Sequence, residues 1–231
     1  MRIGLIGALG FVGSALSHEF SQVKNISCVP IIRGANFANL AKGVDFFIHA
    51  ANPAKRFSAN LHPERDRLET VEKTNDILAG IDGKPILLIS SISCRTQLKT
   101  PYGINRLDCE KEVLKYGGTV VRLGPMFGPS RVNDVLHDIC AGRDVFVSRD
   151  TKYSYSSVMW NAAYIAGNFQ SINGVIEIGA RNTVLLEELA QYTNSLSKFS
   201  EENDDQFPES FIDGPDVSEV FRFIDKNIIG R

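Results

Sequence analysis

Two residues in the middle of the chain have types and a spacing that suit acid/base chemistry. Tyr102 and Arg106 are four residues apart, just after Thr100 and Pro101. A threonine followed by a proline favours a helix start, because the hydroxyl caps free N–H groups and proline suits the first turn. Residues four apart then lie on one helix face. A phenol ionises near pH ~10, so proton transfer at neutral pH needs a nearby cation, which Arg106 supplies. The competing interpretation of an isolated pair is a solvated surface contact.

A hydroxyl-rich strand end comes shortly before this pair. The run ISSIS carries hydroxyl groups at Ser91 and Ser93. We expect Ser91, with Ser93 as the weaker choice, to hydrogen-bond the same substrate oxygen that Tyr102 protonates or deprotonates. The alternative is ordinary hydrogen bonding of these serines to the backbone at a strand end.

The N-terminus supplies a second kind of site. Gly7, Gly10 and Gly13 follow the apolar run Ile3–Ile6 and overlap a predicted helix over Phe11–Phe20. Glycines let a backbone adopt positive φ and approach a diphosphate, and the N–H groups at a helix start attract anions. This strand-to-helix turn therefore predicts a dinucleotide site, whereas the alternative is a turn that is merely rich in glycine.

The remaining pattern predicts how these groups are positioned. Apolar strand-like runs alternate with helical periodicity, which is typical of an α/β fold with a doubly wound parallel sheet. The expected strands are Ile3–Ile6, Ile26–Ile32, Asp45–Ala50, Pro85–Ser90, Thr119–Leu123, Asp144–Ser148 and Val175–Ile178. The later expected helices are Glu64–Leu78, with Leu68, Val71, Ile77 and Leu78 buried, then Pro101–Tyr116, Asn133–Ala141, Val158–Phe169, Leu185–Leu196 and Val217–Ile224.

Length and composition narrow the class of protein. The 231 residues suit a single domain, 1–231, in which residues from about 124 form a small substrate-binding lobe, and the acidic segment Glu201–Asp216 is expected to be an exposed loop. A net charge of −2 argues against nucleic-acid or membrane partners, and no metal site is expected. We expect reduced cysteines, with Cys28 and Cys140 in the core, no signal peptide, and a cytoplasmic location.

The motifs in order resemble those of the extended short-chain dehydrogenase/reductases, in a shortened form. These motifs are GALGFVG from Gly7, VDFFIHAA, LISSIS, PYGINRLDCE and VVRLGPMFGP. The resemblance implies a Rossmann-type fold, and an NAD(P)-dependent enzyme of the nucleotide-sugar epimerase, dehydratase and reductase group. It also implies diphosphate contacts from Gly10, Phe11, Val12 and Gly13, cofactor packing from Ala50 and Ala51, and a catalytic set of Ser91, Tyr102 and Arg106. The family's usual residue at position 106 is lysine, so arginine there puts catalytic competence in question. Glu110, one turn on, could pair with Arg106.

The second expected strand bears on the choice of cofactor. NAD sites of this kind place an acidic residue at its end, but this strand ends on Arg33, which suits the 2′-phosphate of NADP. We therefore expect NADP rather than NAD. Only sixteen steps separate Arg33 from His49, where the family usually has a further strand and helix, so a strand is expected to be missing. His49 is expected to be a packed residue.

The strand-end hydroxyl also limits the reaction. Sugar dehydratases of the family carry an Asp-Glu pair after it, whereas Ile92 and Ser93 follow here. This favours a reductase or an epimerase that acts on a nucleotide sugar or a similar small substrate. Arg122, Tyr153 and Tyr155 are candidate substrate-side groups, with packing as the alternative. The competing hypothesis is a catalytically weak or inactive dinucleotide-binding protein that serves as a redox sensor or assembly partner. A homodimer through the helices Glu64–Leu78 and Pro101–Tyr116 is possible within the family.

Overall fold

The computed structural model describes residues 1–131 and 133–229. The chain divides into two compact units. The first consists of Met1–Arg122 with Ala162–Ile176, and the second of Leu123–Asn161 with Glu177–Arg231. Each unit has its own hydrophobic core. The residues predicted for catalysis and for cofactor binding all lie in the first unit.

A six-stranded sheet has the strand order β2-β1-β3-β4-β5-β9. The strands are β1 (Arg2–Ile6), β2 (Ser27–Ile31), β3 (Phe46–His49), β4 (Ile86–Ser91), β5 (Thr119–Leu123) and β9 (Val175–Ile178). The pairs β1–β2, β1–β3 and β3–β4 are parallel, so their carboxyl ends meet at one sheet edge. β3 is buried at all four residues because helices cover both faces. The expected doubly wound α/β fold is confirmed.

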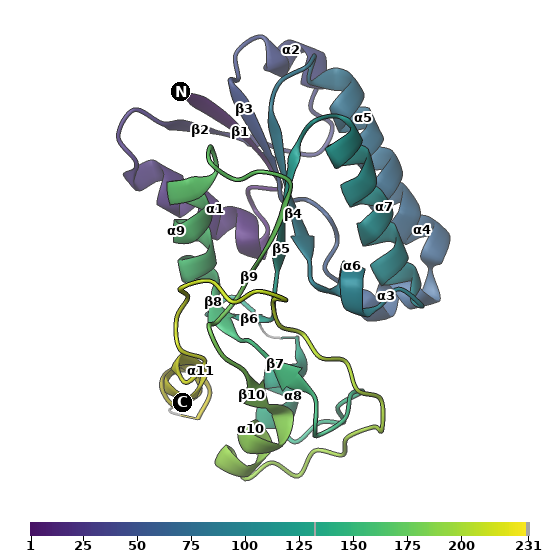
Figure 1. The fold of residues 1–231 in the computed structure, drawn as a ribbon, viewed down its shortest axis with the longest axis vertical. Coiled ribbons are helices and arrows are strands. Elements are labelled where there is room, and N and C mark those ends of the chain that lie inside the picture. Colours follow the sequence, from purple (N-terminus) through teal and green to yellow (C-terminus); the bar gives the residue numbers. More distant parts are fainter. Residues whose placement is uncertain (132, 230–231) are drawn as a thin grey trace. The chain divides into compact units, whose positions relative to one another are not determined.

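Helices of the first unit lie on both faces of its strands: α1 on one, α5 and α7 on the other (Figure 1). The helices are α1 (Phe11–Gln22), α2 (Phe37–Ala41), α3 (Arg56–Leu61), α4 (Pro63–Arg67), the π-helical η1 (Leu68–Glu72), α5 (Lys73–Gly80), α6 (Ser93–Thr96) and α7 (Pro101–Lys115). The helix α9 (Val158–Asn168) connects the two units in sequence. Thr100 caps α7 by accepting a hydrogen bond from Gly103 N at 3.1 Å, with Pro101 in the first turn as predicted.

The second unit is built from short elements. They are β6 (Met126–Phe127), α8 (Val135–Cys140), β7 (Lys152–Tyr153), β8 (Ser156–Ser157), β10 (Val184–Leu185), α10 (Leu186–Tyr192), α11 (Glu219–Ile224) and η2 (Asp225–Ile229). Pairing is β10 with β7 and β6 with β8. That this unit binds substrate stays a prediction.

Several expectations about elements were wrong. Asp144–Ser148 is not a strand, because Val145 forms only an isolated bridge to Phe199. The acidic segment Glu201–Asp216 is not wholly exposed, since the side chain of Gln206 is buried and its backbone bridges to Tyr153.

The long predicted helix Glu64–Leu78 has a π-helical segment in its middle. A π-helix has more residues per turn than an α-helix, which shifts the phase of the buried stripe. Leu68 is therefore exposed, whereas Val71, Ile77 and Leu78 are buried as predicted.

The cysteines and the β2–β3 connection complete the comparison. Cys94 and Cys109 are the buried cysteines, whereas Cys28 and Cys140 are only partly buried, and all four are reduced thiols. Between β2 and β3 the structure has the single helix α2 and no further strand, as the short spacing predicted.

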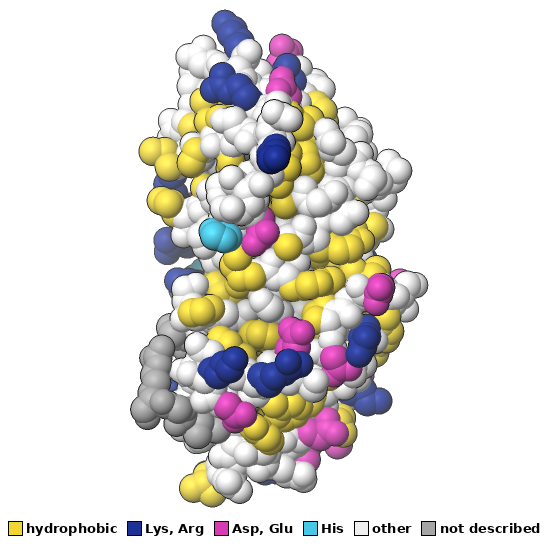
Figure 2. Space-filling model, turned by 90° about the vertical axis from the view of Figure 1, so that its left-hand side faces the viewer, with side chains coloured by type: hydrophobic (Ala, Val, Ile, Leu, Met, Phe, Trp, Pro, Cys, Tyr) yellow, Lys and Arg dark blue, Asp and Glu magenta, His cyan; other side chains and the backbone are white. Residues whose placement is uncertain are grey.

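Charge is mixed on the molecular surface. Lys and Arg side chains alternate with Asp and Glu on the face drawn in Figure 2, and hydrophobic side chains lie among them. No helix within residues 1–131 and 133–229 combines the length and the apolar character needed to cross a membrane.

Candidate cofactor pocket and active site

The glycine turn after β1 packs directly against the start of α1. Gly7 has φ +87°, and a Cβ there would lie 2.7 Å from the Ala50 carbonyl oxygen, so only glycine fits. A Cβ on Gly13 would lie 2.0 Å from the Gly7 carbonyl oxygen. Gly10 precedes the first turn of α1 and donates its N–H to Gly7 O at 2.9 Å. The amide-rich, positive end of α1 is thereby held at the carboxyl edge of the sheet.

A cavity of about 290 Å³ opens beside this turn. Its lining is Gly7, Ala8, Leu9, Gly10, Ile31, Ile32, Arg33, Ala50, Ala51, Asn52 and Lys73. Leu9 is 87% exposed and Ile32 65% exposed, which leaves apolar surface for a planar ring. The Asn52 Oδ1 atom is buried and has no hydrogen-bond partner within residues 1–131 and 133–229. Apolar walls, an orphan acceptor, two cations and a helix N-terminus fit a dinucleotide.

Five of the eight residues predicted to bind cofactor line this cavity: Gly7, Gly10, Arg33, Ala50 and Ala51. Phe11, Val12 and Gly13 lie in the first turn of α1, and Gly13 packs against the Gly7 carbonyl group. Their main-chain amides, rather than their side chains, are the expected hydrogen-bond donors. Contact of all eight residues with a cofactor stays a prediction.

A buried hydrogen-bond network supports the cavity wall from inside. His49 is fully buried, and burial lowers its pKa from 6.5 to about 3, with smaller contributions from the charges of Lys73 and Arg106. It is therefore a neutral packed histidine, as predicted. Its Nδ1 accepts from Ala51 N at 3.3 Å, so the proton is on Nε2, which donates to Thr74 Oγ1 at 3.0 Å.

The network continues to α7 through a cysteine. The Thr74 hydroxyl donates to the Thr70 carbonyl oxygen at 2.7 Å, so Cys109 is the donor in its 3.1 Å contact with Thr74 Oγ1. Burial raises the pKa of the Cys109 thiol, which keeps its proton in place. Asn52 Nδ2 in turn donates to Cys109 Sγ at 3.4 Å. The loop after β3 is thereby fastened to α7, on which Tyr102 and Arg106 lie.

Arg106 points into the protein rather than toward the solvent. Its side chain is only 2% exposed and donates to Thr70 Oγ1 at 2.6 Å and to the Pro53 carbonyl oxygen. Its guanidinium group also lies 3.6 Å from the Asp66 carboxylate. Glu110, which could have paired with Arg106, accepts a hydrogen bond from Arg122 at 2.7 Å instead.

The ring of Tyr102 lies near two guanidinium groups. The Cζ atom of Arg106 is 4.5 Å from the ring centroid, and that of Arg56, on α3, is 6.0 Å away. The ring is buried, and within residues 1–131 and 133–229 the Tyr102 hydroxyl makes no hydrogen bond. This hydroxyl is therefore available to a ligand.

Arg56 also connects Tyr102 to the serines at the end of β4. Arg56 Nη2 donates to Ser93 Oγ at 2.8 Å, and Ser91 Oγ donates to Ser93 Oγ at 3.1 Å. Ser91, Ser93, Arg56 and the Tyr102 ring thus form one polar group at the end of β4. An anionic or carbonyl-bearing ligand suits such a cluster of donors.

The structure gives each of the three candidate substrate-side groups partners inside the protein. Arg122 is bonded to Glu110 through two nitrogen atoms. Tyr153 and Tyr155 are almost fully buried in the core of the second unit, with ring centroids 5.4 Å apart.

Sequence reasoning missed Arg56, Asn52 and Lys73. Arg56 and Asn52 follow β3 in an unpredicted loop and helix, where only their position after a strand's carboxyl end was a signal. Lys73 lay in a predicted helix, and nothing in its spacing separated it from an ordinary surface lysine. In the structure all three lie at the cavity or beside Tyr102.

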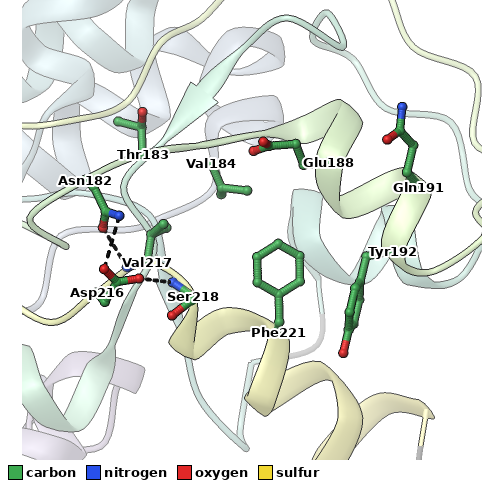
Figure 3. Close-up of a pocket in the computed structure, with 10 residues that line it drawn as sticks. All are labelled: Asn182, Thr183, Val184, Glu188, Gln191, Tyr192, Asp216, Val217, Ser218 and Phe221. Atoms are coloured by element: carbon green, nitrogen blue, oxygen red, sulfur yellow. Dashed lines mark hydrogen bonds between the residues drawn. The ribbon is translucent and has the colours of Figure 1, made fainter.

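A larger, open cavity of about 510 Å³ lies within the second unit (Figure 3). Phe221 and Tyr192 form its apolar wall, with ring centroids 4.7 Å apart. Its polar groups are largely bonded to one another: Asp216 accepts from Asn182 and from Ser218 N. The residues that line it include no lysine or arginine. No group of His, Cys, Asp and Glu able to hold a metal occurs within residues 1–131 and 133–229.

The sheet order and the glycine turn define a Rossmann-type fold, as the resemblance seen in the sequence implied, and the similar solved structures share this fold. No protein-family model matches the chain.

Among solved structures, the UDP-N-acetylglucosamine 4-epimerase of Methanobrevibacter ruminantium is similar, with a TM-score of 0.76 and 15% identity, over 99% of this chain and 97% of that one. The UDP-glucuronic acid 4-epimerase of Bacillus cereus, solved with UDP-glucuronic acid and NAD, has a TM-score of 0.75 and 16% identity, over 95% and 91% of the chains. RMD from Pseudomonas aeruginosa, solved with NADPH, has a TM-score of 0.72 and 16% identity, over 88% and 89%.

A curated relative is the UDP-2-acetamido-2,6-beta-L-arabino-hexul-4-ose reductase of Pseudomonas aeruginosa. It is 25% identical over an alignment 223 residues long, which covers 87% of this chain and 56% of the relative. The chain thus spans about half the length of the curated relative that it matches.

Proposed function

We propose that this chain is an NADP-dependent reductase or epimerase that acts on a nucleotide sugar or a similar small keto or hydroxy substrate. The observation that carries the proposal is the loop after β3. On one side its residues Ala50–Asn52 line the cavity beside the glycine turn, and on the other Asn52 and Pro53 bond to α7. Because β1, β3 and β4 are neighbours, the cavity and the Ser91–Tyr102 cluster share one edge of the sheet.

The chain's own residues have distinct roles in this proposal. A bound nicotinamide supplies hydride transfer. Tyr102 gives or takes a proton through its Oη atom at the substrate oxygen, and Ser91 turns its hydroxyl from Ser93 toward that same oxygen. Arg106, 4.5 Å from the ring centroid, contributes positive charge, and its bonds to Pro53 and Thr70 position the loop and the helix.

The substrate class and cofactor preference rest on different support. Nucleotide sugars are named in the titles of the similar proteins. NADP is proposed because Arg33 lies at the cavity, with no acidic residue between Phe20 and Val44 to accept hydrogen bonds from an unphosphorylated ribose.

A second candidate is a dinucleotide-binding protein without catalysis, which acts as a redox sensor or assembly partner. The inward orientation of Arg106 favours it, because its hydrogen bonds to Thr70 and Pro53 leave fewer donors for a nicotinamide ribose. This candidate requires cofactor binding and no turnover.

The two candidates separate in one series of measurements on the full chain. NADPH and NADH are added to wild type and to Tyr102→Phe, and the change in melting temperature is recorded. NADPH oxidation is then followed with UDP-linked 4-keto sugars, and 4-epimerisation with UDP-N-acetylglucosamine and UDP-glucuronic acid.

We expect NADPH to raise the melting temperature of both proteins, and Tyr102→Phe to remove turnover. Turnover that survives in Tyr102→Phe contradicts the mechanism. Binding without turnover in wild type supports the second candidate, and no shift with millimolar NADPH or NADH contradicts both.

A further inference from the structure

Lys73 is a partly buried cation at the cavity. It is the first residue of α5 and lines the cavity beside the glycine turn. Within residues 1–131 and 133–229 its ammonium group makes no hydrogen bond or ion pair. Removing a charge from water without a partner costs free energy, so such a group suits a site where a ligand supplies the anion.

The second cation at the cavity is held by a carboxylate. Arg33, at the end of β2, is 80% exposed, and its Nη2 lies 3.1 Å from Glu69 Oε2. Glu69 precedes Lys73 by four residues along η1 and α5, which places both on the side of the helix that faces Arg33. Arg33, Glu69 and Lys73 therefore form a three-charge group with a net charge of +1, which we call the cation rim.

The position of the cation rim distinguishes between the phosphates of a dinucleotide. The diphosphate has its own donors in the glycine turn and the first turn of α1. Arg33 instead follows β2, where the adenosine ribose lies in folds of this type. Lys73 lines the same cavity as Arg33.

We propose that Lys73 and Arg33 together bind the 2′-phosphate of NADP, and that Glu69 is a built-in competitor which this phosphate displaces from Arg33. The inference rests on the proposed dinucleotide site and adds its selectivity determinants. Lys73 favours the phosphorylated cofactor, whereas Glu69 repels it and limits its affinity. The balance of these two residues sets the preference for NADP over NAD.

The test is isothermal titration calorimetry of the full chain with NADPH and NADH at fixed ionic strength. A charge-assisted hydrogen bond to phosphate makes Lys73→Met about 10- to 100-fold weaker for NADPH, with less than about 3-fold change for NADH. Glu69→Gln tightens NADPH binding by about 3- to 10-fold and leaves NADH unchanged. The matched control is Glu72→Gln, an exposed residue of η1 paired with Arg67 at 3.3 Å, and it changes neither affinity.

A measurement on wild type avoids dependence on the folding of any variant. Adenosine 2′,5′-bisphosphate and adenosine 5′-monophosphate are titrated between 50 and 300 mM salt. Binding of the bisphosphate is expected to be tighter and to weaken more steeply with salt, because its extra phosphate meets the cation rim.

Each result decides between the hypotheses. Equal weakening of NADPH and NADH by Lys73→Met assigns Lys73 to the diphosphate or adenine and overturns the inference, as does no effect of Lys73→Met on NADPH. Equal salt slopes for the two probes also overturn it. If wild type binds neither dinucleotide, the proposed function itself fails. If wild type binds both while the two rim variants bind as wild type does, only the inference fails.

Discussion

Replacing Arg106 tests whether this residue is the internal clamp that the structure shows. Arg106→Met keeps much of the side-chain length and removes the charge. The change leaves the Asp66 carboxylate buried without the guanidinium group. The Asn105 side-chain amide still donates a hydrogen bond to this carboxylate at 2.9 Å. It also removes the donors to Thr70 Oγ1 and to the Pro53 carbonyl oxygen.

The expected cost follows from burial. Removing one partner of a buried ion pair destabilises a protein by about 3–5 kcal/mol, because the other charge is left uncompensated. For a domain of this size, each kcal/mol lowers the melting temperature by about 2–4 °C, so the expected loss is roughly 6–20 °C. The assay is urea unfolding followed by circular dichroism, with thermal melting beside it.

Controls separate the clamp from a general effect of removing an arginine. Arg65→Met, on the exposed face of α4, changes the free energy of unfolding by less than about 0.5 kcal/mol. The double variant Arg106→Met with Asp66→Asn recovers part of the loss, since no uncompensated charge then remains. If Arg106→Met alone lowers the free energy of unfolding by less than about 1 kcal/mol, the inward orientation is refuted, and Arg106 would then be expected to face the cofactor.

Three further outcomes are expected. Lowering the pH from 7 to 5 destabilises the protein by about 2 kcal/mol through His49: its pKa is about 3 folded and ~6.5 unfolded, so the unfolded state binds more protons in this window and stability rises with pH. His49→Gln removes that contribution. The measurement is urea unfolding at several pH values, and a free energy of unfolding that depends on pH equally in both proteins would contradict the prediction. Gly13→Ala abolishes the dinucleotide-induced rise in melting temperature, because its Cβ would lie 2.0 Å from the Gly7 carbonyl oxygen. The control Gly167→Ala, which has open space in α9, stabilises the protein by about 0.5–1 kcal/mol. Equal effects of the two variants on the melting temperature would be inconsistent with this packing. Thr100→Ala costs about 1 kcal/mol in urea unfolding through loss of the α7 cap, and an unchanged midpoint would speak against that cap.

Local sequence patterns were sufficient for the elements that carry the site. β5 and β9 have the predicted bounds, and α7 begins at Pro101 as predicted, because apolar runs and a Thr-Pro cap are short-range signals. Patterns failed where distant contacts decide. The run Asp144–Ser148 has strand-like residues, but an isolated bridge to Phe199 replaces a ladder. The π-helical η1 could not be inferred from a 3.6-residue period, and it exposes Leu68.

The sequence by itself determined the α/β class, the glycine turn at Gly7 and the tyrosine helix, because each depends on neighbours within a few residues. Only the tertiary structure decided the direction of Arg106. Glu110, which could have paired with it, is one turn away on the same helix, but Arg122 from β5 takes that carboxylate. Arg106 instead meets Asp66, Thr70 and Pro53, which lie 36 or more residues away in the chain. Side-chain burial is a property of packed elements, and no spacing along the chain encodes it.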